Sequence, residues 1–150
     1  MKKKQKKTPP KKTKFELSAG GIVYNKNSKK VLIIKDPRGR FSFPKGRVEE
    51  REAVLNAAKR EVAEETGVKK LEFIAKLGEI KYFYNLKGEF IFKKVVYFFF
   101  ETTQKKLTIQ KEEIKDAFFI GTNQLTKKIS FKNILPIIKE AQKIISKNYD

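Results

Sequence analysis

The sequence predicts a mixed α/β domain, in which one mixed β-sheet is covered by helices. Short apolar runs of strand length alternate with turn residues along most of the chain. Two longer segments, 51–66 and 133–147, have the 3.6-residue periodicity of helices. The chain has 150 residues, of which 39% are hydrophobic. This material suffices for one domain with a substantial core.

The first 14 residues differ in composition from the rest. They contain eight lysines and no acidic residue, so we expect a disordered basic tail (1–14) ahead of a single domain (15–150). Such a tail suits a solubilising extension or weak binding of RNA. The formal net charge of +19 favours polyanionic partners. No apolar run is long enough to span a membrane or to form a secretion signal, so we expect a cytoplasmic protein with no membrane partner.

Turn residues bound the strands in the first half of the domain. A first strand begins at Phe15 and contains Gly20 and Gly21, which indicate a bulge or a close backbone approach. A buried strand follows at 31–35. The segment FSFPKG at 41–46 is a short strand that ends at its proline and glycine.

The second half of the domain predicts a hairpin. Its strands are 71–84 and 90–101, and Asn-Leu-Lys-Gly at 85–88 connects them. The expected order is β-β-β-α-β-β-β-α. The last elements are a strand in DAFFI (116–120), a short helix at 122–128 and an amphipathic helix at 133–147 with Pro136 in its first turn.

The composition excludes several kinds of chemistry. The chain has no cysteine and no histidine, so it forms no disulfide and no Cys- or His-ligated zinc site. Ser-His-Asp and Cys-His nucleophile pairs are excluded as well. Proton transfer and metal binding must therefore use carboxylates, lysine, tyrosine or water. Oxygen ligands of this kind favour Mg²⁺ or Mn²⁺.

Three glutamates crowd one face of the expected helix 51–66. At about 100° per residue, Glu61 and Glu65 fall within the apolar stripe that should face the protein, and Glu64 falls at its edge. Like charges at this spacing repel, the helix dipole disfavours anions in the last turns, and buried charge is costly unless it is paired. A divalent cation would relieve all three penalties. The alternative is an ordinary solvated acidic face.

The segment 46–68 resembles the Nudix signature. That signature reads Gly, five residues, Glu, seven residues, and then Arg-Glu-aliphatic-x-Glu-Glu-x-Gly-aliphatic. The fixed positions are met by Gly46, Glu52, Arg60, Glu61, Val62, Glu64, Glu65, Gly67 and Val68. The resemblance extends over about residues 15–120. It implies a Nudix-type α/β/α sandwich, in which a mixed sheet carries the signature helix on one side and a C-terminal helix completes the fold.

The resemblance also implies a metal site. Glu61, Glu64 and Glu65 would bind Mg²⁺, with Mn²⁺ as an alternative, directly or through water. A backbone carbonyl at Lys45 or Gly46 would complete the site. These positions carry the metal and catalytic roles in the family.

Other signature positions would support the metal ligands. Arg60 would orient the carboxylates by ion pairing, and Gly67 would end the helix. Glu52 lies on the far side of the helical wheel or at the helix start, so we expect a structural role for it. Relatives often have glycine where this chain has Arg51, and this departure predicts a strained turn or an added phosphate contact.

The implied reaction is hydrolysis of a phosphoanhydride bond in a nucleoside diphosphate-linked substrate. A bound metal neutralises the polyphosphate and lowers the pKa of a bound water, and a carboxylate then takes the proton. Within the signature, Glu64 or Glu65 is a candidate base. Outside it, Glu112 and Glu113 lie on the turn before the strand at 116–120, where some Nudix enzymes place such a glutamate. A solvated turn is the alternative reading of these two residues.

Segments outside the signature point to the substrate. FPKG at 43–46 resembles the LPKG segment of Nudix enzymes that cut diadenosine or diphosphoinositol polyphosphates, with Lys45 as a phosphate-binding cation. The strand pair resembles that of diadenosine tetraphosphate hydrolases, in which an aromatic residue stacks on a base. Tyr82 or Tyr84 could do so, although core packing is the alternative. A positive substrate-binding surface could include Arg38, Arg40, Lys45, Arg47, Lys81 and Lys94.

Three functions therefore remain open. The favoured one is an enzyme that cuts dinucleoside polyphosphates such as diadenosine tetraphosphate. A pyrophosphohydrolase acting on the 5′ end of RNA is the second, because the charge and the tail suit a polyanion. The third is a non-catalytic nucleic-acid-binding Nudix module, but the complete set of Glu61, Glu64 and Glu65 argues against it.

Overall fold

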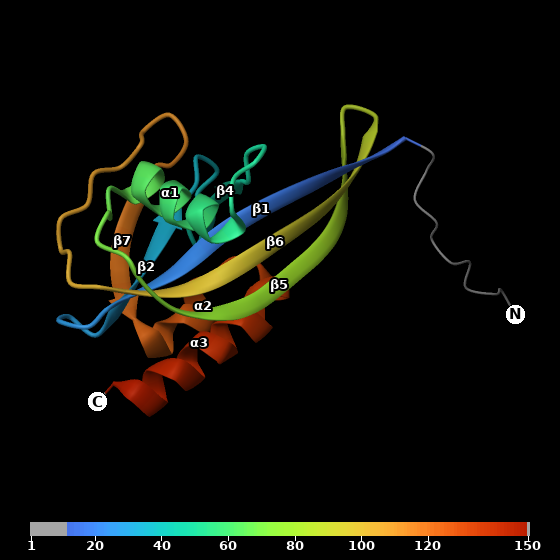
Figure 1. Ribbon diagram of the computed structural model, residues 1–150. Helices are drawn as coiled ribbons and strands as arrows, with labels where there is room; N and C mark the ends of the chain where they lie inside the picture. Colours follow the sequence, from blue (N-terminus) through green and yellow to red (C-terminus); the bar gives the residue numbers. More distant parts are fainter. Residues whose placement is uncertain (1–11, 150) are drawn as a thin grey trace, which may run out of the picture.

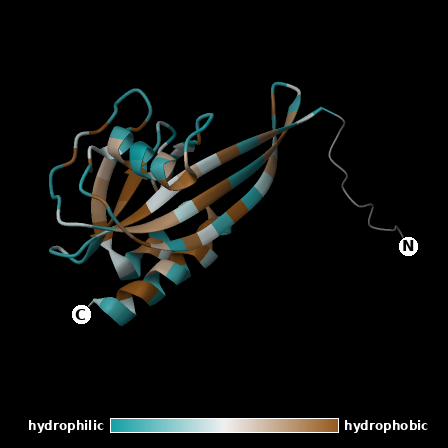
Figure 2. Ribbon diagram, viewed as in Figure 1, coloured by the Kyte–Doolittle hydropathy of each residue, from teal (hydrophilic) through white to brown (hydrophobic). Residues whose placement is uncertain are grey.

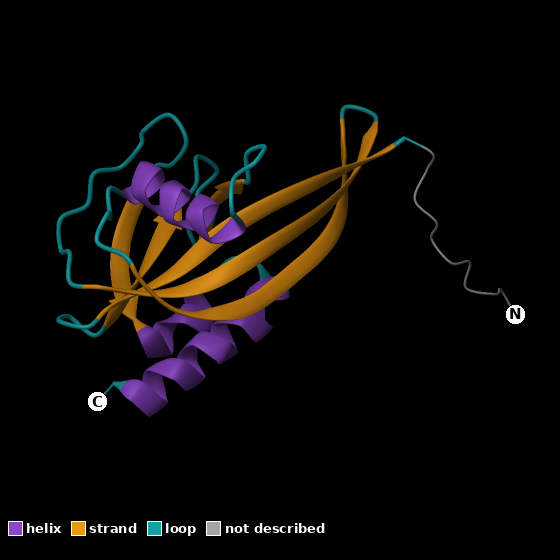
Figure 3. Ribbon diagram, in the orientation of Figure 1, coloured by secondary structure: helices purple, strands orange, loops and turns teal. Residues whose placement is uncertain are grey.

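A single mixed β-sheet lies between helices in the computed structural model, which describes residues 12–149 (Figure 1). The main path of the sheet runs β3-β2-β1-β6-β5, while β4 pairs with β1 and β7 pairs with β2. Helix α1 covers one face, and α2 and α3 cover the other (Figure 3). The expected α/β/α sandwich is therefore confirmed.

The elements follow the expected order with one added strand. The strands are β1 (Thr13–Asn25), β2 (Lys30–Lys35), β3 (Phe41–Ser42), β4 (Lys45–Arg47), β5 (Glu72–Leu86), β6 (Glu89–Thr102) and β7 (Asp116–Gly121). The helices are α1 (Val54–Thr66), α2 (Leu125–Lys128) and α3 (Leu135–Asn148), with short 3₁₀ turns at Thr122–Gln124 and Lys132–Ile134.

Three boundaries differ from those expected. Strand β1 begins at Thr13, so Thr13 and Lys14 belong to the sheet; the rest of the expected tail, residues 1–11, lies outside the described residues. The FSFPKG strand is split into β3 and β4 around Phe43 and Pro44. Helix α1 begins at Val54 rather than at residue 51. Ala53 is still extended (φ −67°, ψ 139°), and Arg51 has a left-handed φ of 63°.

The β5–β6 hairpin is longer than expected because its turn is shorter. Only Lys87 and Gly88 separate the strands, with φ of 51° and 81°. Positive φ at both central residues is the geometry that suits the twist of a tight hairpin. We call the arm the region formed by residues 12–17 and 81–94. It projects beyond α1 and α3 (Figure 1).

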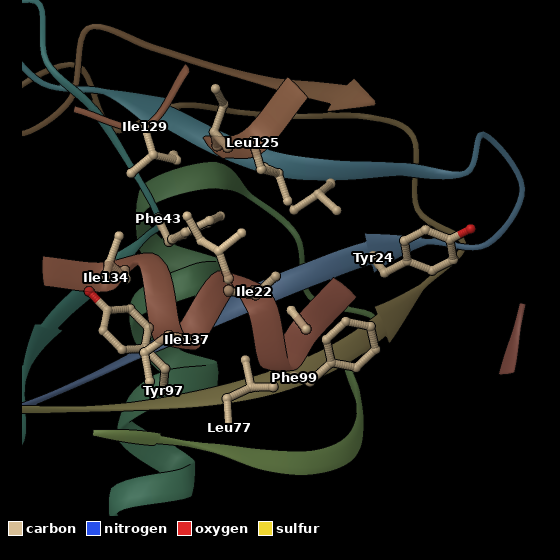
Figure 4. Close-up of a cluster of buried hydrophobic side chains, with 14 of the residues drawn as sticks. Ile22, Tyr24, Phe43, Leu77, Tyr97, Phe99, Leu125, Ile129, Ile134 and Ile137 are labelled. Carbon is tan, nitrogen blue, oxygen red and sulfur yellow. The ribbon is translucent and has the colours of Figure 1, made fainter. Parts of the chain in front are cut away.

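The core has two layers, one on each face of the sheet. On one face Ile22, Tyr97 and Phe99 pack with residues of α3 such as Ile137 (Figure 4). On the other face, β1 and β6 side chains pack with Ala57, Ala58 and Val62 of α1. The apolar run of β6 thus alternates between the two layers, and each large side chain removed from water contributes about 1.5–3 kcal/mol. None of the described helices has the length and apolar character needed to cross a membrane.

The two glycines of β1 mark a close approach between strands, as the sequence predicted. A Cβ on Gly20 would lie 2.7 Å from the Cβ of Lys45, and one on Gly21 would lie 2.8 Å from the Phe100 ring. The Gly21 N–H donates to the carbonyl of Pro44 at 3.1 Å. This approach fixes β4 beside β1 and under α1.

Candidate active site

The three signature glutamates differ in burial, as the helical wheel predicted. Glu61 and Glu65 are buried on the face of α1 that contacts the sheet, whereas Glu64 is exposed. Val62 and Ala58 on the same face enter the core. The apolar stripe therefore brings two carboxylates inside the protein.

Strand β4 receives both buried carboxylates. The Lys45 N–H donates to Oε1 of Glu65 at 3.3 Å. The carboxyl group of Glu61 lies so close to Gly46 that a Cβ there would overlap it. Glycine is thus required at this position for Glu61 to reach the β4 backbone.

This environment raises the pKa of both carboxylates. Burial, together with the charges of Glu61 and Glu113 and against the hydrogen bond from Lys45, raises the pKa of Glu65 to about 8. Burial also raises the pKa of Glu61, although the contact with Arg60 opposes it. Burial and the neighbouring acidic groups therefore disfavour the charged form of both carboxyl groups.

Arg60 is the cation that holds the signature together. Its Nε lies 2.7 Å from Oε2 of Glu52, and its Nη2 donates to Oε1 of Glu52 at 2.9 Å. Its Nη1 lies 2.8 Å from Oε1 of Glu61 and 3.3 Å from Oε2 of Glu64. The Arg60 contact, followed by the Glu49 N–H, lowers the pKa of Glu52 to about 2. Glu52, just before the start of α1, thus fixes the position of the Arg60 guanidinium.

Glu113 is the turn glutamate that acts on the site. Its charge raises the pKa of both Glu61 and Glu65. Its segment is fixed to the end of α1, because the Gln110 N–H donates to the carbonyl of Glu65 at 3.2 Å and Ile114 is buried. We call Glu61 and Glu65 the acidic pair. Of the two turn glutamates considered from the sequence, Glu113 is the one whose charge acts on both members of this pair.

The donor set fits a hard divalent cation. Buried oxygen donors converge on β4 with a surplus of negative charge, and Oε1 of Gln110, beside the end of α1, is buried without a hydrogen-bond partner in the described chain. Within residues 12–149, however, no three acidic side chains are yet grouped as a cation site. Glu61 and Glu65 are together, while Glu64 is turned toward Arg60. Glu64 would have to leave this contact to join them.

A cavity of about 740 Å³ opens on the α3 side of the sheet. Lys45, Arg40, Tyr82 and Tyr84, which the sequence suggested as substrate-binding residues, all line it. Arg47 does not line it and instead forms an ion pair with Glu16 at 3.3 Å. The other residues that line the cavity are Asp36, Pro37, Arg38, Ser42, Ile80, Lys93, Tyr97, Ile129, Phe131, Asn133 and Ile134.

Lys93 is a cavity residue that the sequence reasoning missed. Burial, together with the neighbouring charge of Lys45, lowers its pKa to about 8. Lys81 and Lys94, which were expected on the substrate surface, instead form ion pairs with Glu79 at 3.5 and 3.2 Å. Strand parity was the available signal, because Lys93 shares a face with Tyr97 and Lys94 does not.

The tyrosines form one wall of the cavity. The rings of Tyr82 and Tyr84 lie 6.2 Å apart at 37°. The Tyr84 hydroxyl donates to Oε1 of Glu16 at 2.7 Å, and this bond raises the pKa of Tyr84 to about 12. Burial raises the pKa of Tyr97, and the charges of Tyr82 and Glu65 raise it further. Glu65 therefore acts electrostatically on Tyr97, which lines the cavity.

The opposite wall comes from a segment to which the sequence reasoning assigned no role. Ser130 holds this segment against β3 by two hydrogen bonds to Phe41. The Ser130 hydroxyl accepts the Phe41 N–H at 2.9 Å, and the Ser130 N–H donates to the Phe41 carbonyl at 3.0 Å. The neighbouring Phe131 ring lies 5.3 Å from the guanidinium of Arg40. Arg40 is held in turn by Asp36 at 2.7 Å. The cavity is thus lined by cations from the turn at 36–40, from β4 and from β6, and by aromatic rings that include those of β5 and Phe131.

Comparison with known proteins places this geometry in context. A family model for the NUDIX domain matches residues 14–140. A Mycobacterium tuberculosis protein named as a mutator protein, MutT4, is 28% identical over 144 residues, which cover 90% of this chain and 58% of that protein. Nudix hydrolase 7 of Arabidopsis thaliana is 32% identical over 119 residues, covering 73% of this chain and 40% of the relative. The chain thus spans about half the length of these curated relatives.

Solved structures show the same fold. A binary complex of C. elegans Ap4A hydrolase has a TM-score of 0.68 at 18% identity, and the match covers 88% of this chain and 98% of that one. The E. coli dihydroneopterin triphosphate pyrophosphohydrolase has a TM-score of 0.70 at 16% identity, covering 87% and 99%. At this level of identity the likeness concerns the fold.

Proposed function

The chain belongs to the NUDIX family, and from this premise we propose that it hydrolyses a phosphoanhydride bond in a nucleoside diphosphate-linked substrate. The substrate class that we favour is the dinucleoside polyphosphates, such as diadenosine tetraphosphate. One observation carries the proposal: Lys45 lines the cationic cavity and donates its backbone N–H to Glu65 at 3.3 Å. A phosphate chain held in the cavity would therefore end beside Glu61 and Glu65.

The acidic side would hold the metal. Glu61, Glu64 and Glu65 are the proposed ligands, with a backbone carbonyl of Lys45 or Gly46, and Arg60 positions two of the carboxylates. Mg²⁺ or Mn²⁺ bound there would supply positive charge to the polyphosphate and lower the pKa of a bound water. Glu113 is the proposed base that takes the proton from the attacking water. Its position near the acidic pair supports that role.

The cavity would hold the substrate. Lys45 and Lys93 would bind phosphate oxygens, because two ammonium groups beside each other are stabilised by a polyanion. Tyr82 would stack on a base, and Arg38 and Arg40 would bind the far end of the ligand. A volume of about 740 Å³ lies within the range of small-ligand sites. Cations from both the turn at 36–40 and strands β4 and β6 favour a ligand with charge along its length over a simple triphosphate.

A substrate panel tests the proposal. The full chain would be incubated with Mg²⁺ and diadenosine tetraphosphate, a nucleoside triphosphate, a nucleoside diphosphate sugar or 5′-triphosphate RNA, and products would be quantified by chromatography. We expect the largest kcat/KM for the dinucleotide and none in EDTA. A larger value for the RNA would favour the 5′-end pyrophosphohydrolase instead. Absence of turnover on every substrate by the folded protein would refute the enzyme and favour the nucleic-acid-binding module. We further propose a cytoplasmic location.

A further inference from the structure

The face of the arm on the α1 side carries a row of phenylalanines. Phe15 in β1 is the register partner of Phe92 in β6, which is the partner of Phe83 in β5. The Phe15 and Phe92 ring centroids lie 5.8 Å apart, and those of Phe92 and Phe83 lie 4.7 Å apart. Phe90 stacks on Phe83 at 5.0 Å. Three adjacent strands therefore present one continuous aromatic surface.

This surface is exposed because α1 does not extend over it. The same face of β6 is buried under α1 at Phe98 and Phe100, but the arm lies beyond the helix (Figure 2). Phe15 is 74% exposed and Phe83 is 48% exposed. Leu17, two residues after Phe15 on the same face of β1, adds further exposed apolar area. A contiguous apolar patch of this kind on a charged protein indicates a binding surface.

The row is separate from the candidate active site. Side chains alternate across a strand, so the neighbours Lys93, Tyr82 and Tyr84 face the cavity on the other side of the arm. Only the opposite face carries Phe83 and Phe92. A ligand on the phenylalanine row would therefore leave the cavity free.

The positive charge around the phenylalanine row indicates what kind of ligand it binds. The arm contains six lysines and two glutamates, and the sequence that precedes it is also rich in lysine. Lys81 and Lys94 lie on the same face as the row, where they share Glu79. A second copy of the chain would bring two strongly basic surfaces together, at a net charge of +19 each. A polyanion with planar apolar groups suits both the rings and the lysines.

We propose that the phenylalanine row binds single-stranded RNA, with unpaired bases stacked on Phe15 and Phe83 and phosphates beside the lysines. Exposed aromatic rings on a sheet surface stack bases irrespective of sequence, while a basic surround neutralises the backbone. RNA is the occupant because it commonly presents unpaired bases. The inference is independent of the proposed hydrolytic activity.

The test compares two strands of equal charge. One is a labelled RNA of about 12 nucleotides without a 5′ phosphate, a length within the usual site sizes, and the other is an abasic strand of the same length. Fluorescence anisotropy with the full chain measures both affinities. We expect the wild type to bind the RNA more tightly. Replacing both rings (Phe15→Ser with Phe83→Ser) removes this preference, with a loss of about fivefold or more for each ring.

Two further variants keep the test decisive. Phe73→Ser is the matched control, because Phe73 is 42% exposed but lies outside the arm, and it should retain the wild-type preference. Phe15→Ser alone removes the most exposed ring at little risk to folding, and it should lose about half of the effect in logarithmic terms. Hydrolytic turnover and circular dichroism report whether each variant is folded.

Several outcomes would overturn the proposal. Equal binding of the RNA and the abasic strand by the wild type would show that the lysines act alone. A double variant that binds RNA like the wild type would exclude the row. If the row instead proves necessary for binding phosphatidylserine vesicles or for a dimer in sedimentation, with RNA binding unchanged, it is a membrane or self-association surface.

Discussion

Strand β4 lies between acidic residues on the α1 side of the sheet and basic residues on the α3 side. On the α1 side, Glu61 and Glu65 are buried carboxyl groups whose pKa values are raised. On the α3 side, the cavity brings Lys45 beside Lys93, whose pKa is lowered to about 8. Each side is electrostatically unfavourable by itself, because like charges are held together with little water. A polyphosphate with a divalent cation would satisfy both at once.

The comparison also shows why Lys45 stands where it does. Its backbone N–H binds Glu65 while its side chain enters the cavity. A single residue of a short strand therefore sets the distance between the two charged regions. The close approach of Gly20 keeps that strand in place.

The largest expected effect comes from neutralising the acidic side. Glu65→Gln should lower kcat by about a hundredfold or more while the fold remains, since loss of a metal ligand removes several kcal/mol of stabilisation. Glu64→Gln should also abolish turnover. The remote exposed Glu140→Gln is the matched control and should keep the wild-type rate. Wild-type turnover in the Glu65 variant would remove the metal assignment.

The same substitution separates stability from activity. The pKa of Glu65 is raised to about 8 in the folded protein, so the metal-free fold binds its proton more tightly than the unfolded chain does. The stability that Glu65 contributes is therefore fully present below about pH 4.5 and is lost as the pH rises toward 8. In EDTA at pH 8, Glu65→Gln should have a higher Tm than the wild type, and Mg²⁺ should reverse the order.

Removing a cation from the cavity should have the next largest effect. Lys93→Met should raise KM about tenfold, because a charge-assisted contact contributes about 1.5–3 kcal/mol. Lys94→Met is the matched control on the adjacent residue, which pairs with Glu79, and its KM should not change. Tripolyphosphate binding without divalent metal should weaken in the wild type as the pH passes about 8, when Lys93 loses its proton. Equal KM values in the two variants would contradict this assignment.

Weakening the ion pairs of Arg60 should have a smaller effect than removing a cation from the cavity. Glu52→Gln removes a charged partner of Arg60 and should lower stability by about 1–3 kcal/mol at pH 7 in urea unfolding. The pKa of Glu52 is lowered to about 2, so its contribution is present above about pH 4.5 and is lost as the pH falls toward 2. The difference between variant and wild type should therefore shrink at pH 3. A constant difference would show that the pair contributes little electrostatic energy.

The smallest effect concerns the turn into α1. Arg51 has a left-handed φ of 63°, which costs a side chain about 1–2 kcal/mol, while glycine loses about 0.5–1 kcal/mol in entropy. Arg51→Gly should therefore stabilise the protein by about 0.5 kcal/mol in urea unfolding. If KM rises as well, Arg51 also contacts the substrate. If stability falls, the Arg51 side chain makes a contact that outweighs the strain.

Much of the acidic side was predictable from the sequence. Spacing on one helix placed Glu61 and Glu65 inward and Glu64 at the edge, because an α-helix has a fixed angular period. The glycines of β1 and Gly67 were read correctly, since each occupies a backbone position that excludes a side chain or needs positive φ. The start of α1 was expected three residues too early, because Arg51 is left-handed and Ala53 is extended. The break between β3 and β4 was missed, because it arises where the chain leaves β2 to pair with β1. The disorder of the basic tail remains a prediction, whereas its expected end at Lys14 is corrected because β1 begins at Thr13.

By itself, the sequence determined the local periodicities: which segments are strands or helices, and which carboxylates share the inner face of α1. It could not distinguish Lys93 from Lys94, or Glu113 from Glu112, because opposite faces of a strand and adjacent turn positions look alike until a partner is placed beside them. The tertiary structure decided these, along with the Phe131 wall and the uncovered phenylalanine row. Their environments arise from contacts between residues far apart in the chain, which no local pattern encodes.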